Sequence, residues 1–493
     1  MKSDHLVQAR TAARAVLGAT ALLLANGCSS VAGDPPAIGA LGEALQATHG
    51  HQPHHGDSAS GPAAKACTFV DQDRLFRTIN ADLLSNDARD QRFLRYLSLA
   101  NRENIVGCGA ALDADRAAIL ELINSVSNDA DVHALTAVDA DQTLYRLDLR
   151  DYTWNHPIVV GGQRFADGWE ALIAESPYAL EYSGADADIA KASTHTAVPF
   201  LFGNAFVAAA GRAPLYDALL GIPGDADDLL RNNLGIDAAR GESARAGFAA
   251  SARRGEANFL AQRFEIRARP GFAWQISEFG DLFSDPLGNA DGEREIVFSL
   301  PNGLQGHVLA APDGRLRATS KVLADASEAD GRAHVATSFF RSRADGVQIE
   351  DQVRDFVRAN PRDFSASERD EIRAAYPGQR DLQKLLDGDR KIFSTALGHL
   401  GLDIASQPEP ISQNFSDFSA DLDLNAVAGD LFLTPADLAN NVDLLDAAFA
   451  GLPNGGKIHR DDFTAKFARA NCLFSVVLNN TVRTEVCDRA FQP

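Results

Sequence analysis

The chain has 493 residues, of which 45% are hydrophobic and 23% are charged. These proportions are typical of a globular protein with several packed units, and they exclude wholesale disorder and collagen-like repeats. The 46 Lys and Arg residues stand against 67 Asp and Glu, which gives a formal net charge of -21. So acidic a chain lacks the broad positive surface that neutralises nucleic-acid phosphates, and we expect no nucleic-acid partner.

Residues 1–27 are predicted to be an export signal, because a basic start precedes an apolar run at residues 15–25 that is too short to span a bilayer. The following Cys28 resembles the cysteine of the bacterial lipobox, which becomes the lipidated first residue of a lipoprotein. Cysteine parity favours this interpretation: with Cys28 acylated, the other four of the five cysteines can pair. The alternative is an ordinary signal peptide cut after Ala-x-Gly.

A lipid on Cys28 would anchor the protein to a membrane without spanning it. Ser29 follows it, which resembles the signal for transport to the outer membrane, so we expect an outer-membrane lipoprotein that faces the periplasm or the cell surface. Residues 28–66 contain few bulky side chains and are expected to form a flexible tether. This tether holds four histidines, His49, His51, His54 and His55. They could bind Zn, Cu or Ni, but without a spaced cysteine or carboxylate we interpret them as part of a solvated linker.

Residues 67–130 are predicted to form an N-terminal helical segment. Apolar residues recur at helical spacing over residues 73–85, 92–103 and 113–126. Cys67 and Cys108 bracket the first two of these helices, and we expect them to form a disulfide. Closing a loop of that length contributes on the order of 4 kcal/mol in the chain-entropy model.

Residues 131–325 are predicted to form a mixed α/β domain of short strands, turns and helices. Residues 135–138 and 143–149 alternate around an Asp-rich turn and predict a β-hairpin. A second pair of strands, at residues 295–300 and 305–309, flanks the turn Pro301-Asn302-Gly303. A helix is expected at residues 215–220.

Residues 326–440 are predicted to be helical again. The expected helices cover residues 349–359, residues 366–375 after Ser365 as N-cap, and residues 381–397 with Gly398 as the stop. The fold class is therefore α+β, predominantly helical.

Residues 441–493 are predicted to contain a helix-loop-helix and a C-terminal hairpin. Strand-like runs at residues 472–478 and 481–487 surround Asn479-Asn480, and a two-residue turn there places Cys472 opposite Cys487. Opposed strand residues lie about 4.5 to 5.5 Å apart at Cα, which suits a disulfide.

Two segments resemble parts of calcium-binding loops. Residues 421–425 have the spacing of the first ligands, but the sixth position is Ala426 and the twelfth is Phe432, where the loop needs glycine and a carboxylate. Residues 455–463 resemble the exit of an EF-hand whose earlier ligand positions hold Gly451 and Pro453. We expect a helix-loop-helix without calcium.

Catalytic motifs are not found in the sequence. No G-x-S-x-G, H-E-x-x-H, Walker loop or G-x-G-x-x-G occurs. The histidines after residue 130 are His133, His156, His195, His307, His334, His399 and His459, and none has a metal-ligand spacing from another. We expect no catalytic residue, no metal site and no cofactor.

Several stretches together resemble exported bacterial proteins, often lipoproteins, of a cytochrome c-like family. The matching segments are residues 95–99, 144–154, 214–216, 245–248, 282–283, 285–288 and 298–306, the last (FSLPNGLQG) being the most specific. In that family a C-x-x-C-H haem motif follows some dozens of residues later. Here the resemblance places Phe339 and Ser342 where the cysteines belong and Arg343 where the histidine belongs.

The resemblance therefore implies a fold that has lost its haem. Phenylalanine cannot form a thioether, and arginine stays protonated and cannot ligate iron. The downstream residues 353–361, 364–365 and 376–377 still follow the family pattern. Because an empty haem-sized void would cost several kcal/mol, we expect Phe339 and Phe340 to fill it, with both rings buried between helices.

Three functions fit this sequence. The leading hypothesis is a non-enzymatic cell-envelope lipoprotein without haem, which acts as a binding or assembly component with an envelope protein partner. The alternative is electron transfer by a non-covalent haem or another metal held by scattered histidines. The third is a hydrolase whose residues meet only in three dimensions, which a buried pair of carboxylates in a cleft would favour.

Overall fold

The computed structural model describes residues 67–237, 241–250, 257–267, 269–328, 330–403, 409–478 and Cys487. The export signal, Cys28, the histidine-containing tether and residues 481–486 of the expected hairpin lie outside this part. Helix accounts for 44% and strand for 17%, which confirms a mixed α+β class with more helix than strand. Among the described residues, none of the helices combines the length and apolarity that crossing a bilayer requires.

The helices follow one another along the whole described chain. They are α1 (Gln72–Ser85), α2 (Ala100–Val106), α3 (Asp113–Ser125), α4 (Gly168–Glu175), α5 (Ala185–Thr194), α6 (Gly203–Ala210), α7 (Leu215–Leu219), α8 (Ala226–Asp228), α9 (Thr337–Ser342), α10 (Val353–Ala359), α11 (Ala366–Ala375), α12 (Gln379–His399), α13 (Pro410–Ser419), α14 (Leu424–Asp430), α15 (Pro435–Asn440) and α16 (Arg460–Leu478). Single turns are η1 (Gln91–Phe93), η2 (Gly109–Leu112), η3 (Leu229–Asn233), η4 (Val442–Leu444), η5 (Ala447–Phe449) and η6 (Leu452–Asn454).

The strands form a four-stranded sheet, a six-stranded sheet and a two-stranded ribbon. The first has the order β2 (Thr136–Ala137), β3 (Leu144–Asp148), β1 (Leu94–Ser98), β6 (Phe200–Phe202). The second has the order β12 (Leu316–Arg317), β11 (Gln305–Ala310), β10 (Arg294–Ser299), β9 (Phe272–Glu278), β8 (Ala257–Glu265), β7 (Glu242–Ala250), and β4 (Ile158–Val160) pairs with β5 (Gln163–Phe165).

Strand β1 corrects one prediction, because residues 94–98 were expected to be part of a helix. The strand lies between β3, which is antiparallel to it, and β6, which is parallel, and all five of its residues are buried. A strand covered on both faces reads as a continuous apolar run that periodicity cannot distinguish from a buried helix. The helical prediction holds only for α2, which starts after the strand.

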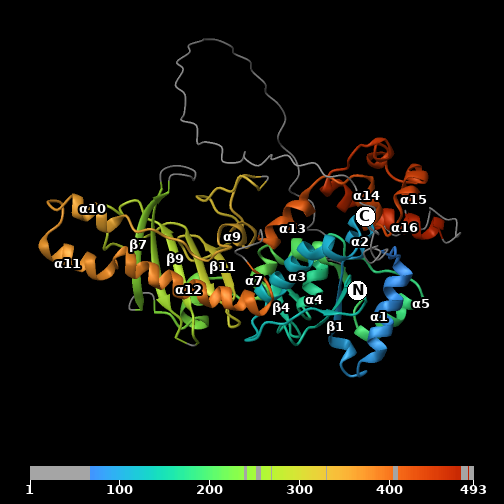
Figure 1. The fold of residues 1–493 in the computed structure, drawn as a ribbon, viewed down its shortest axis with the longest axis horizontal. Helices are drawn as coiled ribbons and strands as arrows, with labels where there is room; N and C mark the ends of the chain where they lie inside the picture. The colour runs from blue at the N-terminus through green and yellow to red at the C-terminus, as the bar shows by residue number, and fades with distance from the viewer. Residues whose placement is uncertain are drawn as a thin grey trace, which may run out of the picture. The chain divides into compact units, whose positions relative to one another are not determined.

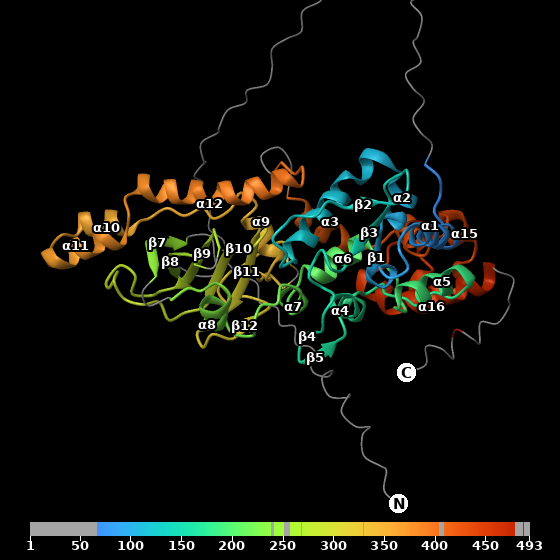
Figure 2. The same cartoon turned by 90° about the horizontal axis from the view of Figure 1, so that it is seen from below.

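The six-stranded sheet is antiparallel, and helix α12 lies across one of its faces (Figure 2). The predicted hairpin of β10 and β11 is confirmed, with Val297 opposite His307. Asp389 of α12 fastens the helix to the sheet. Its carboxylate accepts hydrogen bonds from the guanidinium of Arg263 at 2.7 and 2.9 Å and from Nε1 of Trp274 at 2.9 Å.

The other predicted elements of the middle and of the helical segment agree closely with the structure. The first hairpin forms from β2 and β3, and the helix at residues 215–220 is α7. Ser365 caps α11 with a reciprocal capping box, in which its hydroxyl accepts the amide of Glu368. Helix α10 begins later than expected, and α12 continues one residue past Gly398.

The C-terminal hairpin is the second wrong prediction. Residues 472–478 continue helix α16 rather than forming a strand, although the predicted disulfide Cys472–Cys487 is present with a Cα–Cα distance of 5.7 Å. Leu473 and Phe474 are buried in the core along with Ala470. Burial of one helical face thus outweighs the strand propensity of the valines.

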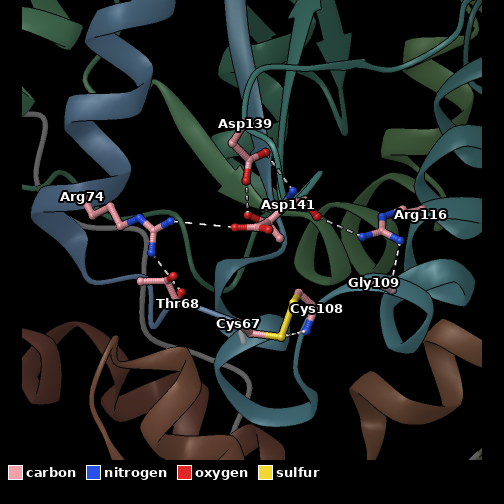
Figure 3. Close-up of a disulfide and its surroundings, with 9 residues drawn as sticks. Cys67, Thr68, Arg74, Cys108, Gly109, Arg116, Asp139 and Asp141 are labelled. Atoms are coloured by element: carbon pink, nitrogen blue, oxygen red, sulfur yellow. Dashed lines mark hydrogen bonds and ion pairs between the residues drawn. A yellow bond between two sulfur atoms is a disulfide. The ribbon is translucent and has the colours of Figure 1, made fainter. Parts of the chain in front are cut away.

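The Cys67–Cys108 disulfide is also present, with a Cα–Cα distance of 5.5 Å (Figure 3). It joins the start of the described chain to the loop after α2, as expected. Around it, Arg74 faces the carboxylate of Asp141, and Arg116 donates to the carbonyl of Gly109 at 2.8 Å. The disulfide therefore lies among ion pairs and hydrogen bonds that join the same segments of the chain.

Helices from the C-terminal third complete the N-terminal core. Helix α13 packs on α3 and α6, and α14 packs on α2 (Figure 1). Buried polar contacts cross the same boundary: Asn101 donates to Asp430 at 2.8 Å, and Asn414 donates to Asp115 at 3.0 Å. Arg460 donates to the second oxygen of Asp430 at 3.1 Å. Segments that are some 300 residues apart along the chain thus share one interior.

The two loops that resembled calcium-binding segments lie side by side. Leu422 and Ile458 exchange both backbone hydrogen bonds, each 2.9 Å long, in an isolated antiparallel bridge. The Asp423 carboxylate accepts the amide of Ala426 and so caps α14. This side chain therefore has a structural role in starting the helix.

Candidate functional site

Phe339 and Ser342 lie in α9, and Arg343 follows at its end. The ring of Phe339 is 2% exposed and stacks on the imidazole of His307, with ring centroids 5.8 Å apart and planes 18° apart. Phe340 meets His307 edge to face at 5.6 Å and Tyr216 at 6.3 Å. Both rings are buried, as predicted, but these aromatic partners lie on strand β11 and helix α7 rather than on two flanking helices.

Arg343 forms a bidentate ion pair. Its Nε and Nη2 donate to the carboxylate of Glu295 over 2.9 to 3.0 Å. The side chains are 10% and 2% exposed, respectively. A fork of this kind fixes both partners in orientation. Arg343 therefore holds the end of α9 against strand β10.

His307 lies between these groups and is kept neutral. Burial and the nearby Arg343 charge lower the pKa of its imidazole to about 3. Its Nδ1 has no hydrogen-bond partner among the described residues. Because Phe339 covers a face of the ring, and because Phe339, Ser342 and Arg343 offer neither a thiol nor an imidazole, these residues do not fit a covalent haem.

The remaining histidines do not gather into a metal site in the part of the chain that the structure describes. There, the one cluster of three Cys, His, Asp or Glu ligand atoms comprises Cys67, Glu103 and Cys108. Its two sulfurs are bonded to each other, so they are not available as thiolate ligands. His133 and His334 contact Asp129 and Asp330, respectively, each four residues away on the chain.

A buried pair of carboxyl groups was the feature expected of a hydrolase, and one such pair occurs. Burial raises the pKa of both Glu121 and Glu409, and the Glu409 charge raises that of Glu121 further, whereas hydrogen bonds at the start of α13 partly offset the rise at Glu409. Glu409 lines a cavity of about 460 Å³. However, its two oxygens accept the amides of Ile411 and Ser412 at 2.8 and 2.7 Å, which caps α13. This geometry assigns Glu409 a structural role.

A larger cavity, of about 710 Å³, lies between α10, α11 and the start of α12. It is lined by four arginines, but exposed acids offset two of them: Arg358 pairs with Asp355 at 2.9 Å and Arg373 with Asp370 at 2.7 Å. Exposed pairs of this kind contribute little energy. The cavity therefore presents mixed charge over a small apolar floor.

A third cavity, of about 340 Å³, lies beside strand β1 and includes Arg92, Arg95 and His195 in its wall. The sequence analysis did not identify it, because residues 92–103 were assigned to a helix. One signal was present: Arg95 interrupts an apolar run, and an arginine in a fully buried strand needs compensating acceptors.

Comparisons with protein-family models, with curated proteins and with solved structures give no match for this chain.

Proposed function

We propose that the mature chain is an exported, lipid-anchored component of a bacterial cell envelope, that it binds another molecule there, and that it carries no covalent haem. The observation that carries this proposal is the closed packing at residues 339–343. Aromatic stacking and a buried ion pair occupy the positions at which the resembled family attaches haem.

Two further features support a binding role in an oxidising compartment. Both disulfides are of the kind that persists outside the cytoplasm. Two of the buried charged groups that could suggest catalysis have structural partners: Glu409 caps its helix, and Arg343 pairs with Glu295. The cavities remain as places for a ligand.

The test is expression of the full chain in a bacterial host, with fractionation, mass spectrometry of the N-terminus and an absorption spectrum. We expect a colourless protein in the outer-membrane fraction, acylated at Cys28, and a Cys28→Ala variant that is released from the membrane. A cytoplasmic, unlipidated chain would overturn the proposal.

Redox activity is the alternative, and His307 is the observation that favours it, since a neutral imidazole with an unpartnered nitrogen is a competent metal ligand. The same spectrum separates the two functions. A Soret band with stoichiometric iron, lost in His307→Phe, would establish a non-covalent haem protein in place of our proposal.

A further inference from the structure

The cavity beside β1 brings together basic groups from separate parts of the chain. Its polar lining residues are Arg92, Arg95, Asn155, Asp167 and His195. They come from η1, strand β1, the loop after β3, the start of α4 and the end of α5. In a chain with a net charge of -21, a concave surface with two arginines and a histidine runs against the overall charge.

Arg95 is the buried member of this group, with a side chain 3% exposed. Its Nη1 is saturated, because it donates to the carbonyls of Arg92, Leu94 and Thr194 over 2.8 to 3.1 Å. Within the described residues its Nε has no hydrogen-bond partner. Its Nη2 lies 3.8 Å from Oδ2 of Asp167, beyond hydrogen-bond distance.

The Nε and Nη2 groups form the edge of a guanidinium that grips a carboxylate with two parallel bonds. Two other buried arginines of this chain use that edge in this way: Arg263 toward Asp389, and Arg343 toward Glu295. Arg95 has the same burial but lacks the matching acceptor. Arg460 is also buried and also leaves its Nε unpartnered, although its Nη1 donates to Asp430. The open edge of Arg95 therefore leaves room for an outside acceptor but does not require one.

The electrostatics agree with this geometry. Burial lowers the pKa of Arg95, and the charges of Asp167 and Glu170 oppose this only in part. Asp167 is also the N-cap of α4, because its Oδ1 accepts a hydrogen bond from the amide of Glu170 at 2.8 Å. The buried positive charge is therefore left without full compensation from within the protein.

His195 adds a second argument. It ends α5 with φ of +57°, a left-handed conformation that glycine adopts freely and other residues adopt at some cost. His195 lines the same cavity as Arg92. Arg92 itself is exposed and lies over the ring of Phe93, 4.5 Å from its centroid.

We propose that this cavity binds the carboxylate of a small organic acid, with Arg95 as the anchor and Arg92, His195 and Asn155 at the rim. This inference rests on the binding role proposed above and names its ligand class. The volume of about 340 Å³ is at the small end of ligand sites. An incoming carboxylate competes with that of Asp167, because both would compensate the same guanidinium.

The experiment is calorimetric titration of the full mature chain with sodium succinate and sodium acetate, against inorganic phosphate and sodium chloride at matched ionic strength. We expect saturable binding of an organic carboxylate. Asp167→Asn, which keeps a good N-cap, should tighten binding about threefold or more, and Arg92→Ala should weaken it by a similar factor. Arg95→Met should abolish it.

The matched control is Arg89→Ala, which removes an exposed arginine that pairs with Asp87 and does not line the cavity, and it should leave binding unchanged. If Arg95→Met does not fold, the opposite effects of Asp167→Asn and Arg92→Ala still decide. Absence of binding in both the native chain and Asp167→Asn would overturn the inference. Tighter binding of phosphate than of either carboxylate, or binding insensitive to Arg92 and Asp167, would overturn it as well.

Failure here is distinguishable from failure of the proposed function. Export and acylation are determined by fractionation and mass spectrometry, so a negative titration removes the ligand class and leaves the envelope assignment. A cytoplasmic chain that still binds succinate would refute the envelope assignment and leave the ligand class standing.

Discussion

Removing Arg343 provides a direct test of whether residues 339–343 form part of the core. Arg343→Ala leaves the carboxylate of Glu295 buried, 2% exposed, and without its bidentate partner. Breaking a buried pair from one side destabilises a protein by about 3 to 5 kcal/mol. This is a large fraction of the roughly 5 to 15 kcal/mol by which native proteins are stable. We expect a loss of that size in urea denaturation followed by circular dichroism.

Two further variants make the measurement specific. Arg343→Met combined with Glu295→Met removes both charges, and it should lose less stability than Arg343→Ala alone, since apolar replacement of a buried pair is often neutral. Arg315→Ala is the matched control, because Arg315 pairs with Asp313 on the surface and its loss should change stability by less than about 1 kcal/mol. If Arg343→Ala cost no more than Arg315→Ala, the reasoning about this position would be refuted.

Further predictions concern titration and cross-links. Native stability should fall by about 2 kcal/mol from pH 6.5 to pH 5, because the unfolded imidazole of His307 takes up a proton that the folded one, with a pKa of about 3, does not. His307→Phe should remove this component from urea midpoints measured across that range. Burial raises the pKa of Asp217 to about 7, so its contribution to stability is present at low pH and is lost as pH rises from about 4 to 7. Asp217→Asn should therefore gain up to about 4 kcal/mol on the native chain over that interval in the same assay, and a constant difference would contradict the assignment. Replacing Cys67 and Cys108 by alanine should lower stability by about 4 kcal/mol, against about 3 for the shorter loop closed by the C-terminal disulfide, and equal losses in calorimetry would count against the chain-entropy account.

The elements that could be predicted from sequence are those marked by a local motif, such as a turn or a helix cap, that the packing of the folded protein does not override. The hairpin of β10 and β11 was identified because two strand-like runs flank the turn Pro301-Asn302-Gly303. Ser365 was recognised as an N-cap because its chemistry is local.

The missed features depend on distant partners. Strand β1 is buried on both faces, so its sequence lacks the alternation that would distinguish it from a helix. The end of α16 contains adjacent valines that favour a strand, but this segment is helical in the structure. The polar cavity was missed along with β1, because the role of Arg95 follows from the strand and not from its neighbours in sequence. Both disulfides were predicted, although Cys472–Cys487 was inferred from a strand that is a helix in the structure. The pairing is still possible because a disulfide requires a short Cα–Cα distance and leaves the type of secondary structure free.

The polar contacts that join α2 and α3 to α13, α14 and α16 have a consequence for how the molecule reaches its native state. The hydrogen bond between Asn101 and Asp430 joins residues 329 positions apart, and the one between Asp115 and Asn414 joins residues 299 positions apart. Neither bond can form before the C-terminal third of the chain is available. Contacts of such sequence separation form late and slow the search for the native topology. A polypeptide threaded through a translocation pore from its N-terminus would therefore remain pliable until the last helices emerge, so its own topology would keep it competent for passage.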